Sequence, residues 1–482
     1  MLQFRLWTAF SAPRKAPRSR DKNNFTRSDC LRILIIMKKL FGTDGIRGLV
    51  GSEEMNEKLG FKLGKALVRY CLTNKINPNI IIGRDTRISG PLLESAVSRG
   101  IKEAGGQIVL AGVIPTSAVA YLVQKENAGL GLVISASHNT YEYNGFKVFK
   151  NDGTKLTDQE ENEIEKLIAE EKIEFYKEDS FTIPEVKNNY NEKYSEFLMN
   201  ILAGDDFKGM KIVLDCANGA TYEVAPYIFK NLGAEVTVIS NSPDGKNINA
   251  ACGSEHTGNL QKAVLKNGAD IGLAFDGDGD RLIAITEKGE RLTGDHLLYI
   301  YAKMLKKKNK LNNNLVVSTV MSNIGFINGL KKIGIRHFQT DVGDRQVYSV
   351  LVKESGVLGG EEAGHLIFLD RHTTGDGILS GLMLFAAMKY FSKPLSELAR
   401  EISLMPKTLL NVRVKNKFDI LTIPEIAGVI KDTEKYLGEE GRVLVRYSGT
   451  EPLCRVMIEG KNEKEIKELA SKIGQVITNT LN

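Results

Sequence analysis

Apolar stretches recur along the chain in a fixed order. Three times, an apolar strand and a turn of small residues are followed by a helical stretch, a second strand, and a third strand that ends in polar residues. The third strands with their polar ends are GLVISASHN at 131–139, IGLAFDGDGD at 271–280 and GVLGGEEAGH at 356–365. Strands that alternate with helices are typical of α/β units, whose ligands bind beyond the carboxyl ends of the strands. Each unit is therefore expected to present one functional loop.

The segment from Met405 onward has a different pattern. It contains strand-like LLNVRV, a helical stretch, RVLVRYSGTEPLCRVMIEG and a charged closing helix, which predicts a smaller α+β domain. The Glu- and Lys-rich stretch 154–194 is interpreted as a solvated helix and linker. The expected fold class is α/β with four domains, three of them related mixed α/β units. The predicted domains are residues 37–195, 196–292, 293–404 and 405–482.

The first 36 residues differ from the rest in charge. They hold eight Lys or Arg and two Asp, which accounts for the whole net charge of +6 of the 482-residue chain. They show neither strand alternation nor a sustained helical stripe, and we expect residues 1–36 to be a disordered leader outside the fold. Two origins stay open: upstream sequence translated ahead of a true start at Met37, or an organelle transit peptide. In both cases the basic charge gives no argument for a nucleic-acid partner.

Composition sets the broad class. With 42% hydrophobic and 26% charged residues, the chain has the composition of an ordinary soluble globular protein. Its apolar runs are far shorter than the roughly 20 residues of a membrane-spanning helix. Five scattered cysteines without CxxC spacing predict neither a disulfide framework nor a zinc site. We therefore expect a cytoplasmic protein without a membrane or nucleic-acid partner.

The second loop has the composition of a metal site. Asp276, Asp278 and Asp280 alternate with glycines between two apolar strands. Three hard oxygen donors at this spacing suit Mg²⁺ or Ca²⁺, and Mg²⁺ commonly binds carboxylates together with phosphate oxygens. An EF-hand is excluded because Arg281 occupies the position that requires glycine and because strands, rather than helices, flank the loop. A solvated Asp/Gly turn is the structural alternative.

The loop of the fourth domain has the composition of an anion site. Arg446, Ser448, Gly449, Thr450 and Arg455 supply two guanidinium groups, two hydroxyls and a glycine backbone. Guanidinium groups donate paired hydrogen bonds to phosphate, and a glycine turn can direct backbone N–H groups at an anion. These residues are interpreted as a phosphate cradle.

Other candidate residues are ambiguous when each is considered alone. Ser137 could be a loop or helix-capping residue as well as a nucleophile. Glu361 and His365 suit sugar hydroxyls, although a single His in a Gly-rich loop is more often structural. Arg47 and Lys147 could equally be exposed surface cations. The chain has no GxSxG, Walker A or usable GxGxxG motif, so lipase-like, P-loop and dinucleotide-binding functions are excluded.

Taken together and in order, the motifs resemble the α-D-phosphohexomutase superfamily. The matching segments are MKKLFGTDGIRG, ISASHN, NGFK, FDGDGDR, GGEEAGH and RYSGTEPLCRVMIEG, and the resemblance covers essentially residues 37–482. Within the superfamily the chain is most similar to bacterial members that act on glucosamine phosphates. The resemblance implies four domains around a central cleft, and a monomer or homodimer that takes a phosphosugar substrate.

The resemblance also implies residue roles. Ser137 would carry the phosphoryl group and, with Asp276, Asp278 and Asp280, bind one Mg²⁺, while His138 and Asn139 would help hold the serine loop. Arg47, His138, Lys147 and Arg281 would surround the transferring group, Glu361 and His365 would contact the sugar, and Arg446, Ser448, Gly449, Thr450 and Arg455 would grip the non-reacting phosphate.

The activity implied is interconversion of glucosamine 6-phosphate and glucosamine 1-phosphate through glucosamine 1,6-bisphosphate, for amino-sugar nucleotide and cell-wall precursor synthesis. Two residues depart from the family pattern: Thr140 stands where Pro commonly follows SHN, and Ala363 where Ser is common. Alternatives are a mutase of neutral hexose phosphates, a non-catalytic phosphosugar-binding paralogue and a phosphatase. Lys147 and His365 are both candidates for the group that removes the hydroxyl proton.

Overall fold

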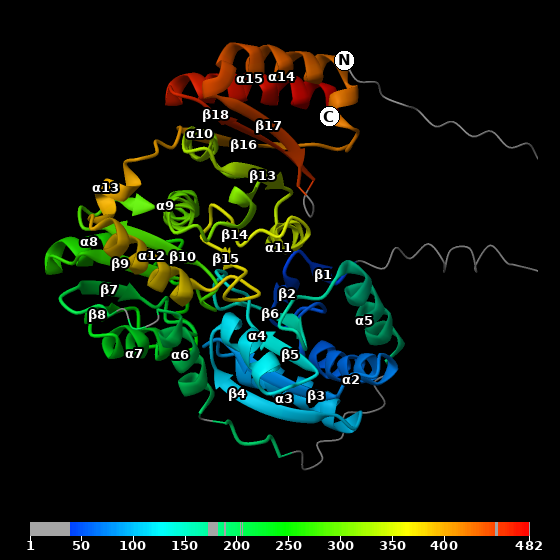
Figure 1. Ribbon diagram of the computed structural model, residues 1–482. Coiled ribbons are helices and arrows are strands. Elements are labelled where there is room, and N and C mark those ends of the chain that lie inside the picture. The colour runs from blue at the N-terminus through cyan, green and yellow to red at the C-terminus, as the bar shows by residue number, and fades with distance from the viewer. Residues whose placement is uncertain are drawn as a thin grey trace, which may run out of the picture. The chain divides into compact units, whose positions relative to one another are not determined.

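The computed structural model describes residues 39–171, 182–187, 189–202, 204, 206–448 and 452–481. The predicted leader, residues 1–36, lies outside them. Leu40–Asn482 forms one compact unit. Figure 1 shows its four sheets with their helices. We refer to the sheets as first to fourth in the order of their strands along the chain.

Three of the sheets share one four-strand arrangement. In each, the first strand pairs in parallel with the second and the third, and the third pairs antiparallel with the fourth. The repetition predicted from the apolar pattern is therefore confirmed. The four strands, in sheet order, are β4, β3, β5 and β6 (Gln107–Val113, Asn79–Arg84, Leu130–Ile134, Tyr143–Lys150); β8, β7, β9 and β10 (Glu235–Ile239, Lys211–Asp215, Ile271–Phe275, Leu282–Thr286); and β13, β12, β14 and β15 (Arg336–Thr340, Leu315–Thr319, Leu358–Gly360, Leu366–Phe368).

Helices connect the consecutive parallel strands of each repeated sheet. A parallel connection must be long, because the chain has to return to the end of the sheet at which the first strand began. Each repeated sheet has two of these helices, between its first and second and between its second and third strands. They are α3 and α4 (Gly90–Glu103, Thr116–Lys125), α7 and α8 (Val224–Asn231, Gly258–Asn267), and α10 and α11 (Ile324–Lys332, Asp344–Lys353). The polar loops then fall between the third and fourth strands, at the carboxyl ends of the third strands.

The units differ at their edges. The first sheet is extended by β1 and β2 (Phe41–Gly42, Gly45–Leu49), where β2 pairs antiparallel with β6 and sets Arg47 opposite Gly145. The second sheet is extended by the short strand β11 (Arg291–Leu292), which pairs with β10. The remaining helices of these units are α2 and α5 (Glu57–Thr73, Asp158–Glu170), α6 (Tyr190–Ile201), and α9, α12 and α13 (Gly294–Lys307, Gly377–Phe391, Leu395–Ala399).

The stretch predicted to be a solvated linker is only partly so. Helix α5 begins with a capping box between Thr157 and Glu160, but it buries Ile164 and Ile168 against the first domain. Tyr190 and Tyr194 of α6 are buried in the main core. Glu and Lys dominate the composition of this stretch and conceal the few apolar residues that anchor both helices.

The hydrophobic core is continuous through the first three domains and separate in the fourth. One cluster joins side chains such as Ile81, Leu214 and Phe368 from three sheets. The fourth domain has its own cluster, which includes Ile426 and Val456. Its strands are β16, β18 and β17 (Lys407–Arg413, Leu453–Glu459, Arg442–Tyr447), covered on one face by α14 and α15 (Pro424–Leu437, Glu463–Leu481) (Figure 1).

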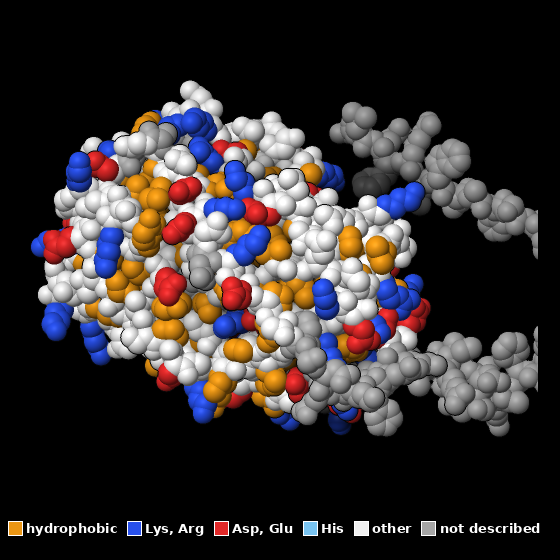
Figure 2. All heavy atoms as spheres, turned by 90° about the horizontal axis from the view of Figure 1, so that it is seen from below, with side chains coloured by type: hydrophobic (Ala, Val, Ile, Leu, Met, Phe, Trp, Pro, Cys, Tyr) orange, Lys and Arg blue, Asp and Glu red, His pale blue; other side chains and the backbone are white. Residues whose placement is uncertain are grey.

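Surface features add two limits. Among the helices that the structure describes, none has both the length and the apolar character needed to cross a membrane. On the face shown in Figure 2, Lys and Arg side chains are interspersed with Asp, Glu and hydrophobic ones. The described residues of that face therefore form no broad field of a single sign of the kind that binds a nucleic-acid backbone.

Candidate active site

Ser137 lies at the carboxyl end of β5, in the loop that leads to β6. Its side chain is 1% exposed, and its φ of 51° is in the left-handed region that few residues other than Gly and Asn adopt. Its Oγ donates a hydrogen bond of 2.6 Å to Oδ2 of Asp276, in the corresponding loop of the second unit. The polar loops of two units therefore meet at the serine hydroxyl.

The three aspartates of the second loop form a buried cluster. One oxygen from each of Asp276, Asp278 and Asp280 lies within 4.8 Å of the others. Oδ1 of Asp278 and Oδ1 of Asp280 are buried and have no hydrogen-bond partner. Burial, together with the charges of Asp280 and Asp278, raises the pKa of Asp276 well above its usual value. Clustered carboxylates with unused oxygens fit a hard divalent cation, so the triad fits a metal ion.

Lys147 lies on β6 and is 2% exposed, so the surface interpretation of this residue is wrong. Its Nζ lies 2.7 Å from Oδ2 of Asp278, 3.0 Å from Oδ2 of Asp280 and 2.9 Å from Oδ2 of Asp44. Burial favours the neutral amine, but these three carboxylates raise the pKa of Lys147 well above its usual value. The side chain is therefore an ammonium ion that offsets part of the charge of the aspartates.

The third loop joins the same cluster through His365. Its Nδ1 lies 3.6 Å from Oδ1 of Asp280, and its Nε2 lies 3.2 Å from Oδ2 of Asp344. Burial alone would lower the pKa of His365, but the two carboxylates raise it to about 10. Its Nε2 also accepts a 3.1 Å hydrogen bond from the backbone N–H of Gly375. Glu361 lies in the same loop, where its Oε1 accepts a hydrogen bond of 3.0 Å from the backbone of Gly343.

Three further predicted residues surround the serine and the aspartates. His138 has its Nδ1 3.4 Å from Oγ of Ser137. Burial, with the nearby charges of Arg281 and Arg47, lowers the pKa of His138 to about 4, so the imidazole is neutral near pH 7. The backbone N–H of Arg281 donates to Oδ1 of Asp276 at 3.1 Å. The imidazole of His138 and the guanidinium groups of Arg281 and Arg47 thus lie in the same region as Ser137 and the aspartates.

The predicted phosphate cradle forms a second group, in the fourth domain. Arg446 and Arg455 lie directly opposite each other on β17 and β18. Nη2 of Arg455 lies 3.4 Å from Oγ of Ser448. Burial and the facing charge of Arg455 lower the pKa of Arg446. Like charges opposed on a sheet are unfavourable, and an anion between them would relieve the repulsion. Gly449 and Thr450 lie outside the described residues.

Four residues of the cluster were missed by the sequence analysis. Nζ of Lys155 bridges the carboxylates of Asp44 and Asp344, and so links the first domain to the third. Thr116 donates from its Oγ1 to Oδ2 of Asp278 at 2.6 Å and from its backbone N–H to the Asp278 carbonyl at 2.9 Å. Only Asp44 had a local signal, because it lies three residues before Arg47 in GTDGIRG.

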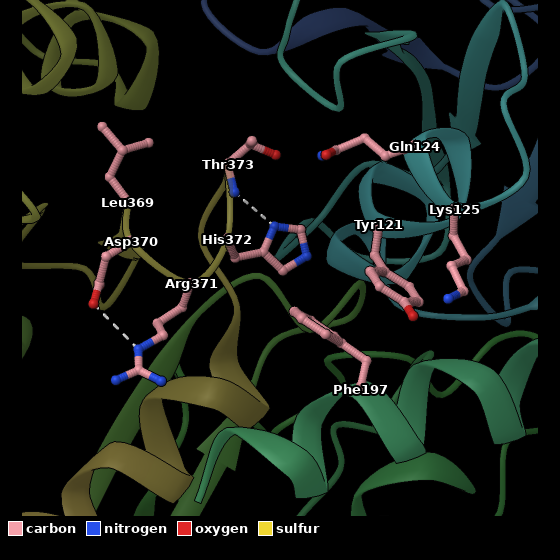
Figure 3. A pocket seen from close by; sticks show the side chains of 9 residues that line it. All are labelled: Tyr121, Gln124, Lys125, Phe197, Leu369, Asp370, Arg371, His372 and Thr373. Atoms are coloured by element: carbon pink, nitrogen blue, oxygen red, sulfur yellow. Dashed lines mark hydrogen bonds and ion pairs between the residues drawn. The ribbon is translucent and has the colours of Figure 1, made fainter. Parts of the chain in front are cut away.

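A cavity of about 420 Å³ opens elsewhere on the protein (Figure 3). Tyr121 of α4 stacks on Phe197 of α6, and His372, from the loop after β15, forms a T-shaped pair with Phe197. None of the predicted site residues that the structure describes lines this cavity. Its size is ordinary for a ligand pocket, but the predicted chemical groups gather at the buried aspartates instead.

Models of the phosphoglucomutase/phosphomannomutase family match the chain in four parts. The α/β/α domains I, II and III match residues 38–175, 189–289 and 293–404, and the C-terminal domain matches residues 409–475. The chain belongs to the phosphoglucomutase/phosphomannomutase family.

Relatives within this family are close in sequence. The phosphoglucosamine mutase of Syntrophobacter fumaroxidans is 49% identical over 450 residues, which cover 92% of this chain and 99% of that protein. The phosphoglucosamine mutase of Clostridioides difficile is 48% identical over 454 residues, which cover 92% of this chain and 100% of that one. The similarity thus extends over nearly the whole length of both relatives.

Solved structures of the family support the fold. A phosphoglucomutase/phosphomannomutase family protein of Burkholderia thailandensis has a TM-score of 0.73 at 21% identity, and the match covers 92% of this chain and 98% of that chain. N-acetylphosphoglucosamine mutase of Aspergillus fumigatus, in complex with glucose 1,6-bisphosphate, has a TM-score of 0.65 at 16% identity, with 93% and 96% covered. The family fold therefore persists at low sequence identity.

Proposed function

We propose that this protein is a phosphoglucosamine mutase that interconverts glucosamine 6-phosphate and glucosamine 1-phosphate through a phosphoserine and glucosamine 1,6-bisphosphate. Its product would feed the synthesis of UDP-N-acetylglucosamine and cell-wall precursors. The observation that carries the proposal is the 2.6 Å contact between Oγ of Ser137 and Oδ2 of Asp276, which joins the serine loop to the buried aspartates. The four matching family domains and the relatives named phosphoglucosamine mutase support the same activity.

The aspartate triad is proposed to hold one Mg²⁺ together with the phosphate on Ser137. When bound, Mg²⁺ neutralises negative charge on the phosphoryl oxygens and helps to fix their orientation. Oδ1 of Asp278 and Oδ1 of Asp280 have no hydrogen-bond partner, and we propose them as donors to the cation.

The proposed step is a transfer between two oxygens. The bond between phosphorus and Oγ of Ser137 breaks while a bond forms from phosphorus to the free hydroxyl oxygen of the sugar, whose proton passes to a base. In the return step, the bond between the other phosphorus and its sugar oxygen breaks while a bond forms from that phosphorus to Oγ of Ser137. The serine proton passes to the released sugar oxygen, so the enzyme regains its phosphate. Arg47, Lys147 and Arg281 would stabilise the charge on the transferring group in a water-poor site.

The sugar and its second phosphate are proposed to bind the third and fourth domains. Glu361 and His365 would contact the sugar, and Arg446, Ser448, Gly449, Thr450 and Arg455 would grip the phosphate that does not react. Neighbouring carboxylates raise the pKa of both candidate bases, Lys147 and His365. Either residue could accept the proton of the sugar hydroxyl only in its unprotonated form. Both Lys147 and His365 therefore remain candidates for the general base.

Two further proposals concern the setting of the enzyme. A cytoplasmic location is supported by Cys71, Cys216, Cys252 and Cys454, all of which are buried free thiols. A monomer or homodimer is proposed for the oligomeric state, with a phosphosugar rather than nucleic acid as the partner.

The substrate test is a comparison of kcat/KM for glucosamine 6-phosphate, glucose 6-phosphate and mannose 6-phosphate. Preference for glucosamine 6-phosphate is expected, and better use of a neutral sugar would assign the protein to the hexose mutases instead. Ala363 is the observation that favours that second candidate, because it lacks the hydroxyl common at this position of the sugar loop. Release of inorganic phosphate in step with substrate loss would identify a phosphatase, and binding without turnover a non-catalytic paralogue.

A further inference from the structure

The peptide group that follows the Ser137 Cα is held by donors from two domains. Its carbonyl oxygen accepts from Nη2 of Arg87 at 3.0 Å and from Nδ2 of Asn249 at 2.8 Å. The carbonyl oxygen of Asn139, two residues on, accepts from the same two nitrogens at 2.8 and 2.9 Å. One donor follows β3 of the first domain and the other belongs to the second domain, so the serine loop is gripped from both sides.

Arg87 is built into this position. It is 1% exposed, and its Nε donates to Oδ2 of Asp85 at 2.8 Å. The two terminal nitrogens donate to four backbone carbonyls of the serine loop, those of Ser137, Asn139, Thr140 and Tyr143. All five N–H groups of the guanidinium thus have acceptors, an arrangement that a lysine ammonium with three donors cannot reproduce.

Asn249 completes the grip and requires a close approach. Its side chain is buried and its φ is 58°. A Cβ atom on Gly277 would lie 2.6 Å from the Ser137 carbonyl oxygen and 2.7 Å from Nδ2 of Asn249. Gly277, which lies between Asp276 and Asp278, therefore lacks the Cβ atom that would prevent Asn249 of the second domain from reaching the serine loop.

The N–H side of Ser137 is fixed as well. Its backbone N–H donates to Oγ of Ser135 at 2.9 Å, and that hydroxyl donates to Oδ2 of Asp85 at 2.5 Å. Asp85 also accepts from Nε of Arg87, so the same carboxylate serves both sides of the serine. The left-handed backbone of Ser137 is thus determined by its surroundings, as strained functional residues require.

We propose that Arg87 and Asn249 are positioning residues that hold Ser137 in the conformation in which its Oγ faces Asp276 and the phosphoryl group can be transferred. Neither side chain touches the sugar or the reacting phosphorus in this proposal, which rests on the function proposed above. Their loss would let the loop relax to ordinary backbone angles and would move Oγ away from the aspartates.

The test compares two asparagines of matched conformation. Asn218 also has a positive φ, of 47°, and its Nδ2 also donates to a backbone carbonyl, that of Asn247 in its own domain. Glycine tolerates these angles, so Asn249→Gly and Asn218→Gly remove the side chain without adding backbone strain. Asn249→Asp keeps the shape but faces the two carbonyl oxygens with a carboxylate. Arg87→Lys keeps the charge but loses the fork.

The measurements are kcat, KM, thermal stability and the occupancy of phosphate on Ser137 by intact mass after incubation with glucose 1,6-bisphosphate. For Asn249→Gly we expect kcat about 10-fold lower, and for Asn249→Asp and Arg87→Lys about 100-fold lower, with KM within about 2-fold, because misplacement of a reacting group acts mainly on kcat. Phosphate occupancy should fall in parallel. Asn218→Gly should keep the wild-type kcat and occupancy.

Equal kcat and occupancy in Asn249→Gly, Asn249→Asp and Asn218→Gly would overturn the inference. So would a uniform loss of stability that accounts for the activity changes of both glycine variants. If Arg87→Lys does not fold, the Asn249 and Asn218 pair still decides. A wild-type protein that neither turns over the substrate nor takes up phosphate on Ser137 would instead refute the proposed function.

Discussion

Nζ of Lys147 lies 2.7 Å from Oδ2 of Asp278, although the two residues belong to different domains and are 131 positions apart. The same ammonium also lies within 3.0 Å of Asp280 and of Asp44. A protein cation therefore sits among carboxylates that also fit a metal ion, and the two charges share one site.

Replacing Lys147 should make the protein less stable and more responsive to metal. Lys147→Met leaves the aspartates buried without their partner, which typically costs about 3–5 kcal/mol. Mg²⁺ or Mn²⁺ should restore part of this loss, because a ligand stabilises the state that binds it. The measurement is Tm with and without each ion. Lys150→Met, on the same strand but more exposed, is the control. An equal metal-induced rise in Tm for both variants would contradict the prediction that the Lys147 ammonium and the metal ion use the same carboxylates.

Ser137→Ala should abolish turnover and the phosphate found by mass spectrometry. The reason is that no other group would supply the oxygen that carries the phosphoryl group in the proposed step. Ser98→Ala is the matched control, because Ser98 is also a buried serine and lies in α3. Normal turnover by Ser137→Ala would refute the phosphoserine mechanism.

The two facing arginines of the fourth domain should act on substrate affinity. Arg446→Ala or Arg455→Ala would remove charge-assisted hydrogen bonds to the non-reacting phosphate, worth about 1.5–3 kcal/mol, so KM should rise about 10-fold to 100-fold. For Arg446→Ala, Tm should stay the same or rise, because the change relieves the repulsion from the facing Arg455. Arg413→Ala on the neighbouring strand β16 is the control. An unchanged KM would argue against the phosphate cradle.

Asp295 should make stability depend on pH. Burial raises its pKa to about 7, although it accepts a 2.8 Å hydrogen bond from the backbone of Asn323. The folded protein therefore binds this proton more tightly than the unfolded chain does. The contribution is fully present below pH 4 and is lost as pH rises to about 7, by up to about 4 kcal/mol.

Asp295→Asn should remove this dependence and be more stable than wild type at pH 8. The measurement is the Tm of both proteins at pH 5 and pH 8. Asp270→Asn is the control, since Asp270 also accepts from a backbone N–H, that of Lys211, but lies near the surface. A parallel pH dependence of Tm in wild type and Asp295→Asn would contradict this prediction.

Much of the fold was predictable because the order of apolar strands and polar loops along the chain indicates the three repeated units. The third strand of each unit is apolar and ends in a polar loop, and the shared topology places these loops at equivalent positions. The first three loops could therefore be named from the sequence. The domain boundaries and the individual roles of the site residues stay predictions.

The missed residues had no comparable signal. Lys155 lies in a charged stretch and Asp344 at the start of α11, and only the folded chain brings both to Asp44. The sequence also provided no signal of burial. Lys147 could equally be a surface cation by its local pattern, and Arg87 was not singled out at all, yet both side chains are nearly inaccessible. Carboxylates surround Lys147, and a carboxylate and backbone carbonyls surround Arg87. Tertiary contact decides such positions, and local composition does not record it.

The reversal from a parallel third strand to an antiparallel fourth strand occurs three times, and each reversal carries a different set of reactive side chains. A duplicated unit could therefore acquire a new chemical task through changes in this short turn, while the apolar strands on either side of the turn stay the same. An ancestral chain would then have needed only one kind of α/β unit. Duplication of that unit, followed by changes in each loop, would have produced an enzyme with three different functional loops.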